Sequence, residues 1–218
     1  MTFEAPTAGD PATPADLLAR LEAAGDAERA ARDRAANRTD RETLGVPAET
    51  LNEIAAGIRQ TEGIDRRVLL ADALWRDGRH DARILGAKIL TQARIRPDDG
   101  PWSLLERWMH DVDCRAASDA VAAATARRLA ADLSRMALLD DWLSAASPWT
   151  RRTGVEAVRF LAKAKHPSEA EAQARAEVVA RLAPLTADTR PVIARSVEAF
   201  RRDLARHAPE SAARLGAD

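Results

Sequence analysis

Apolar and polar positions follow each other along most of the chain with the spacing of helices. In the stretch 44–59, a turn precedes an apolar stripe made by Leu51, Ile54, Ala55 and Ile58, which is the three- and four-residue spacing of one helix face. No apolar run approaches the roughly 20 residues that a membrane-spanning helix needs. The pattern therefore predicts an all-α protein without a membrane segment.

The beginning of the chain has a different character. Residues 1–12 are rich in Pro, Ala and Thr, and they lack the basic and apolar regions of a signal peptide. Thr13 followed by Pro14 is a helix start signal, because Thr caps a helix and Pro suits its first position. We expect a disordered leader over 1–12 and a single helical domain over 13–215.

Tryptophans mark a repeat. Trp75, Trp108 and Trp142 are 33 and 34 residues apart, each near the end of a short apolar helix that a longer helix follows. A fourth helix pair lacks the tryptophan. Helix pairs at such a fixed period are typical of an α-solenoid, an α-α superhelix whose second helices line a concave surface. We expect the tryptophans to pack between helices.

Composition supports this fold class. Hydrophobic residues make up 46% of the 218 residues and charged residues 31%, which excludes wholesale disorder. The single cysteine, Cys114, allows no internal disulfide and fits a reducing compartment, so we expect a cytoplasmic protein. The net charge is −1, but residues 149–218 carry 13 Lys and Arg against 9 Asp and Glu, a net +4. DNA binding, dimer assembly or a solvated helix face would each explain this modest asymmetry.

Several kinds of chemistry have no support in the sequence. The four histidines lie far apart and only one cysteine is present, so we expect no metal site. Glycine-rich phosphate loops and the nucleophile motif G-x-S-x-G are absent. We therefore expect neither a metal nor a small-molecule cofactor.

Asp119 is the first candidate for chemistry, because it interrupts an Ala-rich helix. It follows Ser118, so a structural interpretation is also open. Ser118 or Asp119 would then cap the helix that runs to about Leu133.

An arginine pair is the second candidate. Arg151 and Arg152 stand near Trp149 at the start of a helix, where the helix dipole disfavours cations. Either an anionic partner or a salt bridge to Asp140, Asp141 or Glu156 would explain them. A basic stripe would continue from the pair if further cations face the concave surface, namely Lys163, Lys165, Arg195, Arg201 and Arg202. Phosphate binding and a solvated face are both open for this stripe.

Taken together, these stretches make the chain similar to a known family. It resembles the AlkD-like DNA alkylation repair family, alkylpurine DNA glycosylases built from HEAT-like helical repeats. The landmarks, from about Leu44 to Pro209, are LGVPAETLNEIA, ALWRDGRHDARILGAKIL, the span from Asp113 to Asp119, SPWTRRTGV and VIARSVEAFRRDLARHAPE.

The resemblance assigns roles to individual positions. The family's carboxylate, the last residue of a W-D-x-x-D motif, corresponds to Asp119, and its arginine, three residues after a tryptophan, corresponds to Arg152. The tryptophan of W-D-x-x-D is replaced by Arg115, and the other aromatic residue by Ala199. A cation at position 115 would oppose an oxocarbenium-like transition state, pair with Asp119 four residues on, or favour a phosphate.

The resemblance implies a monomeric protein that binds alkylated duplex DNA on a basic concave surface. Asp119 would act in excision of N3- or N7-alkylated purines. The residues expected to bind DNA are Arg152, Arg151, Arg115, Arg195, Lys163 and Arg202. The alternative from another class is a non-catalytic HEAT-repeat scaffold that binds DNA or protein, with Asp119 as a cap.

Overall fold

A computed structural model of the chain describes residues 11–216, and all regular structure within them is helical. This confirms the all-α class. Residues 1–10 of the expected leader lie outside the described range. The described residues divide into two compact units, one ending at Leu90 and the other beginning at Thr91. The expectation of one domain over 13–215 stays a prediction.

The first unit contains five helices. Their bounds are α1 (Pro14–Ala23), α2 (Ala27–Asn37), α3 (Ala48–Thr61), α4 (Ile64–Asp77) and α5 (His80–Leu90). Helix α5 packs against both α3 and α4, and all of its residues except Lys88 are buried. The start signal at Thr13 is confirmed, since its hydroxyl accepts from the amide of Asp16 at 3.2 Å and Asp16 returns the contact in a capping box.

Gly45 allows two backbone segments of the first unit to approach closely. Gly45 has φ +75°, and a Cβ there would lie 2.3 Å from the carbonyl oxygen of Asp26. The buried carboxylate of Asp81 holds the same loop, because it accepts from the amides of Leu44 at 2.7 Å and Val46 at 2.9 Å. The turn predicted before the helix over 48–61 is thus fixed by a backbone contact that only glycine permits.

The second unit is a stack of helices that carries both candidates for chemistry. The bounds of its helices are α6 (Asp99–Met109), α7 (Arg115–Ala131), η1 (Leu133–Leu138), α8 (Leu139–Ser144), α9 (Pro148–Ala157), α10 (Arg159–Lys163), α11 (Glu169–Leu182), η2 (Ala183–Ala187), α12 (Pro191–Ala205) and α13 (Pro209–Leu215), where η marks a 3₁₀ helix.

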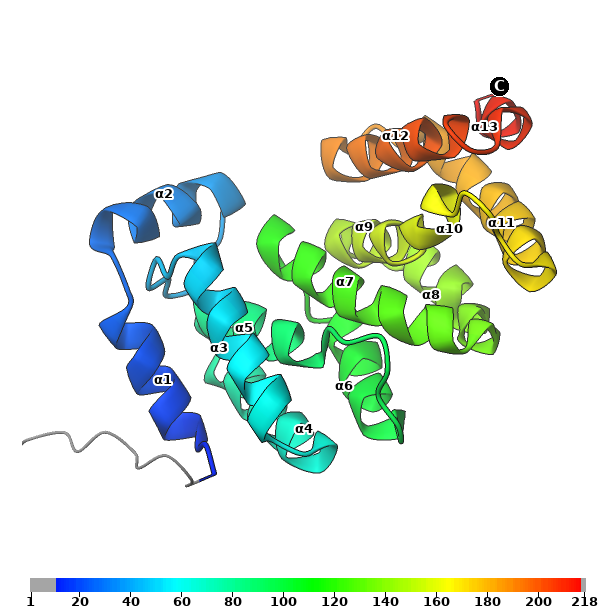
Figure 1. Cartoon of the computed structure of the whole chain (residues 1–218). Helices are drawn as coiled ribbons and strands as arrows, with labels where there is room; N and C mark the ends of the chain where they lie inside the picture. Colours follow the sequence, from blue (N-terminus) through cyan, green and yellow to red (C-terminus); the bar gives the residue numbers. More distant parts are fainter. Residues whose placement is uncertain (1–10, 217–218) are drawn as a thin grey trace, which may run out of the picture. The chain divides into compact units, whose positions relative to one another are not determined.

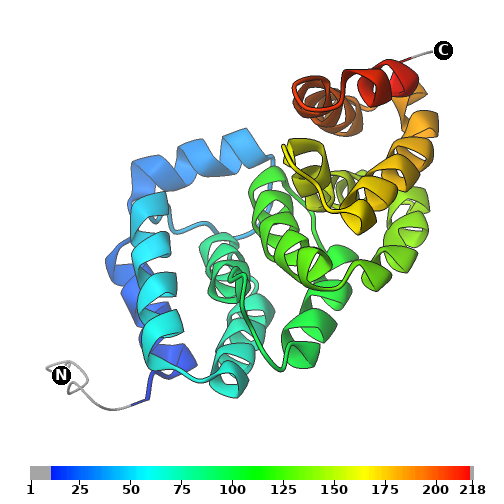
Figure 2. The same ribbon diagram turned by 45° about the vertical axis from the view of Figure 1, so that its right-hand side comes forward.

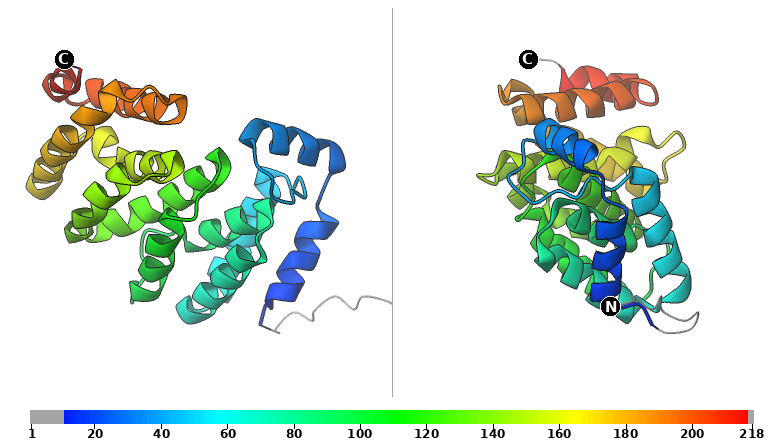
Figure 3. Two further views of the ribbon diagram at one scale, coloured as in Figure 1. Left: turned by 180° about the vertical axis from the view of Figure 1, so that it is seen from behind. Right: turned by 90° about the vertical axis from the view of Figure 1, so that its left-hand side faces the viewer.

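Helices α7, α9 and α12 lie side by side in that order and run in the same direction (Figure 1). Helix α6 packs on α7, α8 on α9, and α13 on α12. Two further views of the second unit show the same order (Figures 2 and 3). Since these three helices are parallel, they begin on one side of the second unit.

The tryptophans pack between helices, as the repeat predicts. Trp108 and Trp142 are fully buried and Trp75 nearly so. The ring of Trp142 lies 6.2 Å from that of Trp102. Gly154 brings α9 close to this core, since a Cβ at that position would lie 3.2 Å from the Cβ of Trp142.

A buried arginine fixes the segment that precedes α6. Arg128, fully buried on α7, donates to the carbonyl oxygens of Gln92 and Ala93 and, at 3.1 Å, to the carboxylate of Asp98. Arg135 donates to both oxygens of Asp98, at 2.8 and 2.9 Å. This network is charge-assisted, so it holds the segment more firmly than neutral hydrogen bonds would.

Two helix boundaries differ from the sequence-based expectation. Helix α7 begins at Arg115, three residues before Ser118, because Cys114 is extended (φ −151°, ψ 169°) and the residues after it are good helix formers. The helix expected to start near the arginine pair is divided into two, since α9 ends at Ala157 and α10 begins at Arg159. Arg159 is the first residue of α10, and it donates to Asp203 of α12.

Candidate functional site

Asp119 and Arg152 meet between α7 and α9. Asp119 lies in the second turn of α7, and its side chain is 49% exposed. Arg152 is 10% exposed in its side chain, and its Nη2 donates to Oδ1 of Asp119 at 2.5 Å. The interpretation of Ser118 or Asp119 as a helix cap is wrong, because Cys114 occupies the cap position.

Two hydroxyl groups fix the orientation of Arg152. Its Nη1 donates to Oγ of Ser118 at 2.5 Å, and Ser118 Oγ lies 2.8 Å from Oγ1 of Thr153. Thr153 donates its single hydroxyl proton to the carbonyl of Trp149 at 2.7 Å, so Ser118 must donate to Thr153. The hydrogen bonds therefore run in one direction from the guanidinium to the backbone of α9.

Arg115 stands on the other side of Asp119. Its Nε lies 3.7 Å from Oδ2, one helical turn away, and its side chain is 73% exposed. The pairing expected from the four-residue spacing is confirmed. An exposed pair of this kind contributes only about 0–1 kcal/mol, so Arg115 is free to turn toward another anion.

Glu156 connects the pair to α10 and α12. Its Oε1 accepts from the hydroxyl of Ser196 at 2.6 Å and lies 3.8 Å from Nη2 of Arg152. Its Oε2 accepts from Nη1 of Arg159 at 2.7 Å. Of the partners considered for the arginine pair, Glu156 is thus the one that Arg152 meets.

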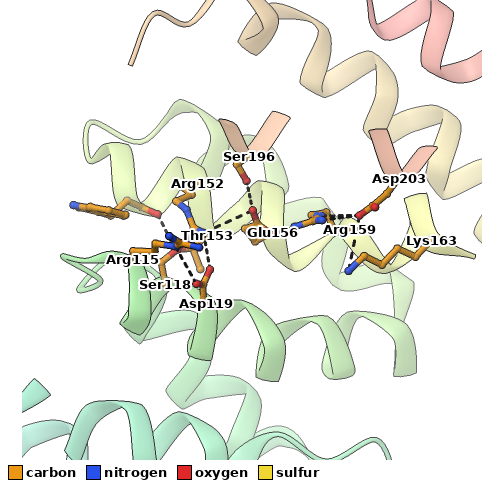
Figure 4. Close-up of polar contacts among 11 residues, drawn as sticks. Arg115, Ser118, Asp119, Arg152, Thr153, Glu156, Arg159, Lys163, Ser196 and Asp203 are labelled. Atoms are coloured by element: carbon orange, nitrogen blue, oxygen red, sulfur yellow. Dashed lines mark hydrogen bonds and ion pairs between the residues drawn. The ribbon is translucent and has the colours of Figure 1, made fainter. Parts of the chain in front are cut away.

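Arg159 continues the series to α12 (Figure 4). Its Nε and Nη2 both donate to Oδ2 of Asp203, at 3.0 and 2.6 Å, and Lys163 lies 3.9 Å from the same oxygen. Burial lowers the pKa of Arg159, but the hydrogen bonds with Glu156 and Asp203 outweigh it and raise the pKa above its ordinary value. Cations and carboxylates therefore alternate across four helices.

A pocket of about 360 Å³ opens on this series, and we call it the arginine pocket. Its lining residues are Arg115, Asp119, Trp149, Arg152, Glu156, Arg159, Val192, Arg195, Ser196 and Ala199. Trp149 supplies the aromatic ring among them. Ala199 is half-buried at its wall, whereas the neighbouring Phe200 is 0% exposed and belongs to the core. The ring at position 200 therefore does not replace the aromatic residue that the resemblance expects at 199.

A second pocket of about 340 Å³ adjoins the first, and we call it the alanine groove. Its lining residues are Thr91, Asp119, Ala122, Ala123, Ala126, Arg127, Ala130, Glu156, Arg159, Phe160 and Lys163. Asp119, Glu156 and Arg159 line both pockets. These three side chains form the common wall.

The expected DNA-binding residues are distributed unequally. Arg152, Arg115 and Arg195 line the arginine pocket, and Lys163 lines the alanine groove. Arg195 is exposed.

Arg151 and Arg202 line neither pocket. Arg151 donates to the carbonyls of Ala145 at 2.5 Å and Ser144 at 3.4 Å, and it lies 3.6 Å from Asp188. It therefore ties α9 to the end of α8. Arg202 lies 3.9 Å from Glu198 on the exposed face of α12. DNA binding by these two residues stays a prediction.

Sequence reasoning missed several members of the site, namely Arg127, Arg159, Ser196 and Asp203, and it considered Glu156 only as a salt-bridge partner. Helical spacing carried the signal for some of them. Glu156 is four residues after Arg152, and Arg127 is eight after Asp119, so each pair shares a helix face. Within residues 11–216, no group of three or more His, Cys, Asp or Glu side chains is placed to hold a metal ion. No helix in that range is long and apolar enough to cross a membrane.

Comparisons with known proteins fit this architecture. Two crystal structures of Streptococcus mutans proteins resemble the fold, each at 15% sequence identity and each covering 92% of this chain and 87% of its own. They are smu.31 from strain UA159, with a TM-score of 0.62, and AlkD2, with a TM-score of 0.64. A comparison with curated proteins found no match. The family model for the DNA alkylation repair enzyme matches residues 17–214, and the chain therefore belongs to the DNA alkylation repair enzyme family.

Proposed function

We propose that this protein binds alkylated duplex DNA at the arginine pocket and excises N3- or N7-alkylated purines. The observation that carries the proposal is the contact of Asp119 with Arg152 at 2.5 Å inside a pocket lined by cations and one tryptophan. The carboxylate at the pocket wall supplies a negative charge for the sugar of the substrate. The arginine beside it supplies a positive charge for the phosphate backbone. The protein would act as a monomer in the cytoplasm, which fits its single cysteine.

The chemistry suits a single carboxylate. An alkylated purine with a positive ring is already a good leaving group, so little acid catalysis is needed. As its bond to the sugar breaks, positive charge develops on the sugar, and a carboxylate stabilises an oxocarbenium-like transition state. Asp119 is half-exposed and lines the pocket, so its carboxylate can reach a sugar and position water.

Arg152 would hold a backbone phosphate beside that sugar. Ser118 and Glu156 restrict its guanidinium from two sides, and a preoriented fork loses little freedom when it binds phosphate. The alanine groove continues from the pocket, and Arg127 and Lys163 line it. Cations along such a path would contact phosphate in any sequence.

The test is release of methylated bases from alkylated duplex DNA. Wild type should release N3- and N7-methylpurines, and Asp119→Asn should abolish release. Asp141→Asn, which makes the same substitution at an exposed position on α8, should release bases like wild type. Equal release by wild type and Asp119→Asn would contradict the catalytic role.

A second function has its own supporting observation. Asp119 is shared between Arg152 and Arg115, and Arg115 stands where the family has a tryptophan. This charge distribution favours a DNA-binding relative without excision. That alternative predicts no base release, together with salt-sensitive duplex binding that Arg152→Ala weakens. If the protein neither releases bases nor binds duplex DNA, the remaining hypothesis is a non-catalytic helical scaffold.

A further inference from the structure

We infer that the arginine pocket selects a phosphate monoester, carried on the end of a DNA strand or on a free nucleotide. The inference rests on the proposed function, because it names the kind of nucleic acid that the same pocket would take. The first observation is the charge of the side chains that line the pocket. The pocket is lined by the guanidiniums of Arg115, Arg152, Arg159 and Arg195 and by the carboxylates of Asp119 and Glu156, a net charge of +2. Asp203, which pairs with Arg159, does not change this sum, because Lys163 lies beside it.

A phosphodiester inside a strand carries one negative charge, whereas a phosphate monoester carries about −1.5 to −2 at pH 7. The monoester therefore matches the charge of the pocket, and the diester leaves part of it uncompensated. Arg152, Glu156 and Arg159 form the part of the pocket that is mostly buried, and uncompensated charge costs more there than at an open surface.

Of the four arginines, Arg115 and Arg195 are the two that can move to meet such a ligand. Arg152 and Arg159 are mostly buried, and carboxylates hold them in position. Arg195 is exposed and makes no ion pair with any described residue, and Arg115 makes only its 3.7 Å contact with Asp119. Arg115 comes from α7 and Arg195 from α12, so the two can close on a phosphate from different helices.

The pocket offers more than charge. Its volume of about 360 Å³ exceeds the space that a phosphate alone needs, and Trp149 lines it. An indole ring stacks on a base or packs against a sugar with little regard for sequence. Residues from the first turns of three helices, Arg115, Trp149 and Val192, also line the pocket. The positive ends of these helix dipoles reinforce the attraction of the guanidiniums for an anion.

The experiment measures duplex binding by fluorescence anisotropy with three substrates of one sequence. They are an uninterrupted duplex, a nicked duplex with a 5′-phosphate at the nick, and the same nicked duplex with a 5′-hydroxyl. The phosphate should tighten binding about tenfold over the hydroxyl, which is the size that one further charge-assisted hydrogen bond supplies. The preference should shrink below about pH 6, where a monoester loses its second charge.

Variants connect the preference to the pocket. Arg195→Ala and Arg115→Ala should each bring the ratio between phosphate and hydroxyl close to one. Arg214→Ala changes an exposed arginine of α13 that lines neither pocket, and it should keep the wild-type ratio. A ratio unaffected by Arg195→Ala would overturn the assignment.

Competition separates the sources of the monoester. Displacement of the 5′-phosphate duplex by deoxyadenosine monophosphate, but not by deoxyadenosine, supports a site that also takes free nucleotides. Equal binding of all three duplexes overturns the inference and leaves the proposed duplex binding intact. Binding of the monophosphate without binding of any duplex supports the inference and contradicts the proposed function. Absence of all binding contradicts both.

Discussion

Arg152 of α9 donates to Asp119 of α7 at 2.5 Å, although 33 residues separate them in the chain. The guanidinium is buried and held by Ser118, whereas the carboxylate remains half-exposed at the wall of two pockets. The cation is therefore the fixed member of the pair and the carboxylate the accessible one. This arrangement suits a residue that must reach a ligand while its partner stays in place.

Arg152→Ala should lower the free energy of unfolding by about 2 kcal/mol, because it leaves the buried hydroxyl of Ser118 without its charged donor. Arg115→Ala removes only an exposed contact at 3.7 Å and should cost no more than about 0.5 kcal/mol. Urea denaturation of both variants checks this difference. Equal losses would show that the burial of Arg152 does not determine its contribution.

Arg115→Trp should increase the rate of base release about tenfold if Asp119 acts in excision. The substitution removes a cation from the place where positive charge develops and supplies a ring whose face attracts it. Single-turnover release from methylated duplex DNA measures the effect. The gain in the rate of base release should vanish when Asp119→Asn is added. A gain that persists in the double variant would show that the effect of Arg115→Trp does not depend on the carboxylate.

Gly45 and Gly57, both in the first unit, should respond in opposite directions to alanine. Gly45→Ala forces a Cβ to 2.3 Å from the Asp26 carbonyl at φ +75° and should destabilise the chain by about 2 kcal/mol or more. Gly57→Ala, inside α3 with no atom within 4 Å of the new Cβ, should stabilise it by about 0.5–1 kcal/mol. Thermal unfolding of both variants provides the comparison. A stabilising Gly45→Ala would contradict the close approach described for this loop.

Acid should weaken the fold partly through Asp98. Hydrogen bonds from Arg135 lower the pKa of this carboxyl below its ordinary 3.8, and the charges of Arg135 and Arg128 add to the effect, against burial, which raises it. A lowered pKa in the folded state means that the unfolded chain binds the proton more readily. The stabilisation is therefore complete above pH 3.8 and is lost as the pH falls through the lower folded value.

Asp98→Asn removes this contribution. The free energy of unfolding should then fall less between pH 5 and pH 3 in the variant than in wild type, as urea denaturation at each pH would measure. Asp141→Asn, at an exposed carboxyl without an ion pair among residues 11–216, serves as the matched control. A variant with the wild-type dependence on pH would exclude Asp98 as a source of acid sensitivity.

The sequence could predict the helix pairs because tryptophans recur at a near-constant spacing and each one is buried between helices. The sequence could not show which of two adjacent residues, Arg151 or Arg152, contacts Asp119. Adjacent residues point about 100° apart on a helix, and the direction depends on how α9 rotates against α7 and α8. Arg151 meets the end of α8 as a result, and Arg152 meets Asp119.

Local spacing explains other successes and failures. Arg115 and Asp119 are four residues apart, so their contact follows from helix geometry alone. Ser196 and Asp203 share one face of α12, but their partners Glu156 and Arg159 are 40 and 44 residues earlier. Nothing in the local pattern states which faces of α9, α10 and α12 meet, because tertiary packing determines it.

The common wall of Asp119, Glu156 and Arg159 has a thermodynamic consequence for any ligand. An anion in the arginine pocket that draws on Arg159 also changes the charge that the common wall presents to the alanine groove. Occupancy of one pocket must then alter the affinity of the other, and the coupling free energy is the same in both directions. Successive nucleotides of one strand placed in the two pockets would therefore not bind independently of each other.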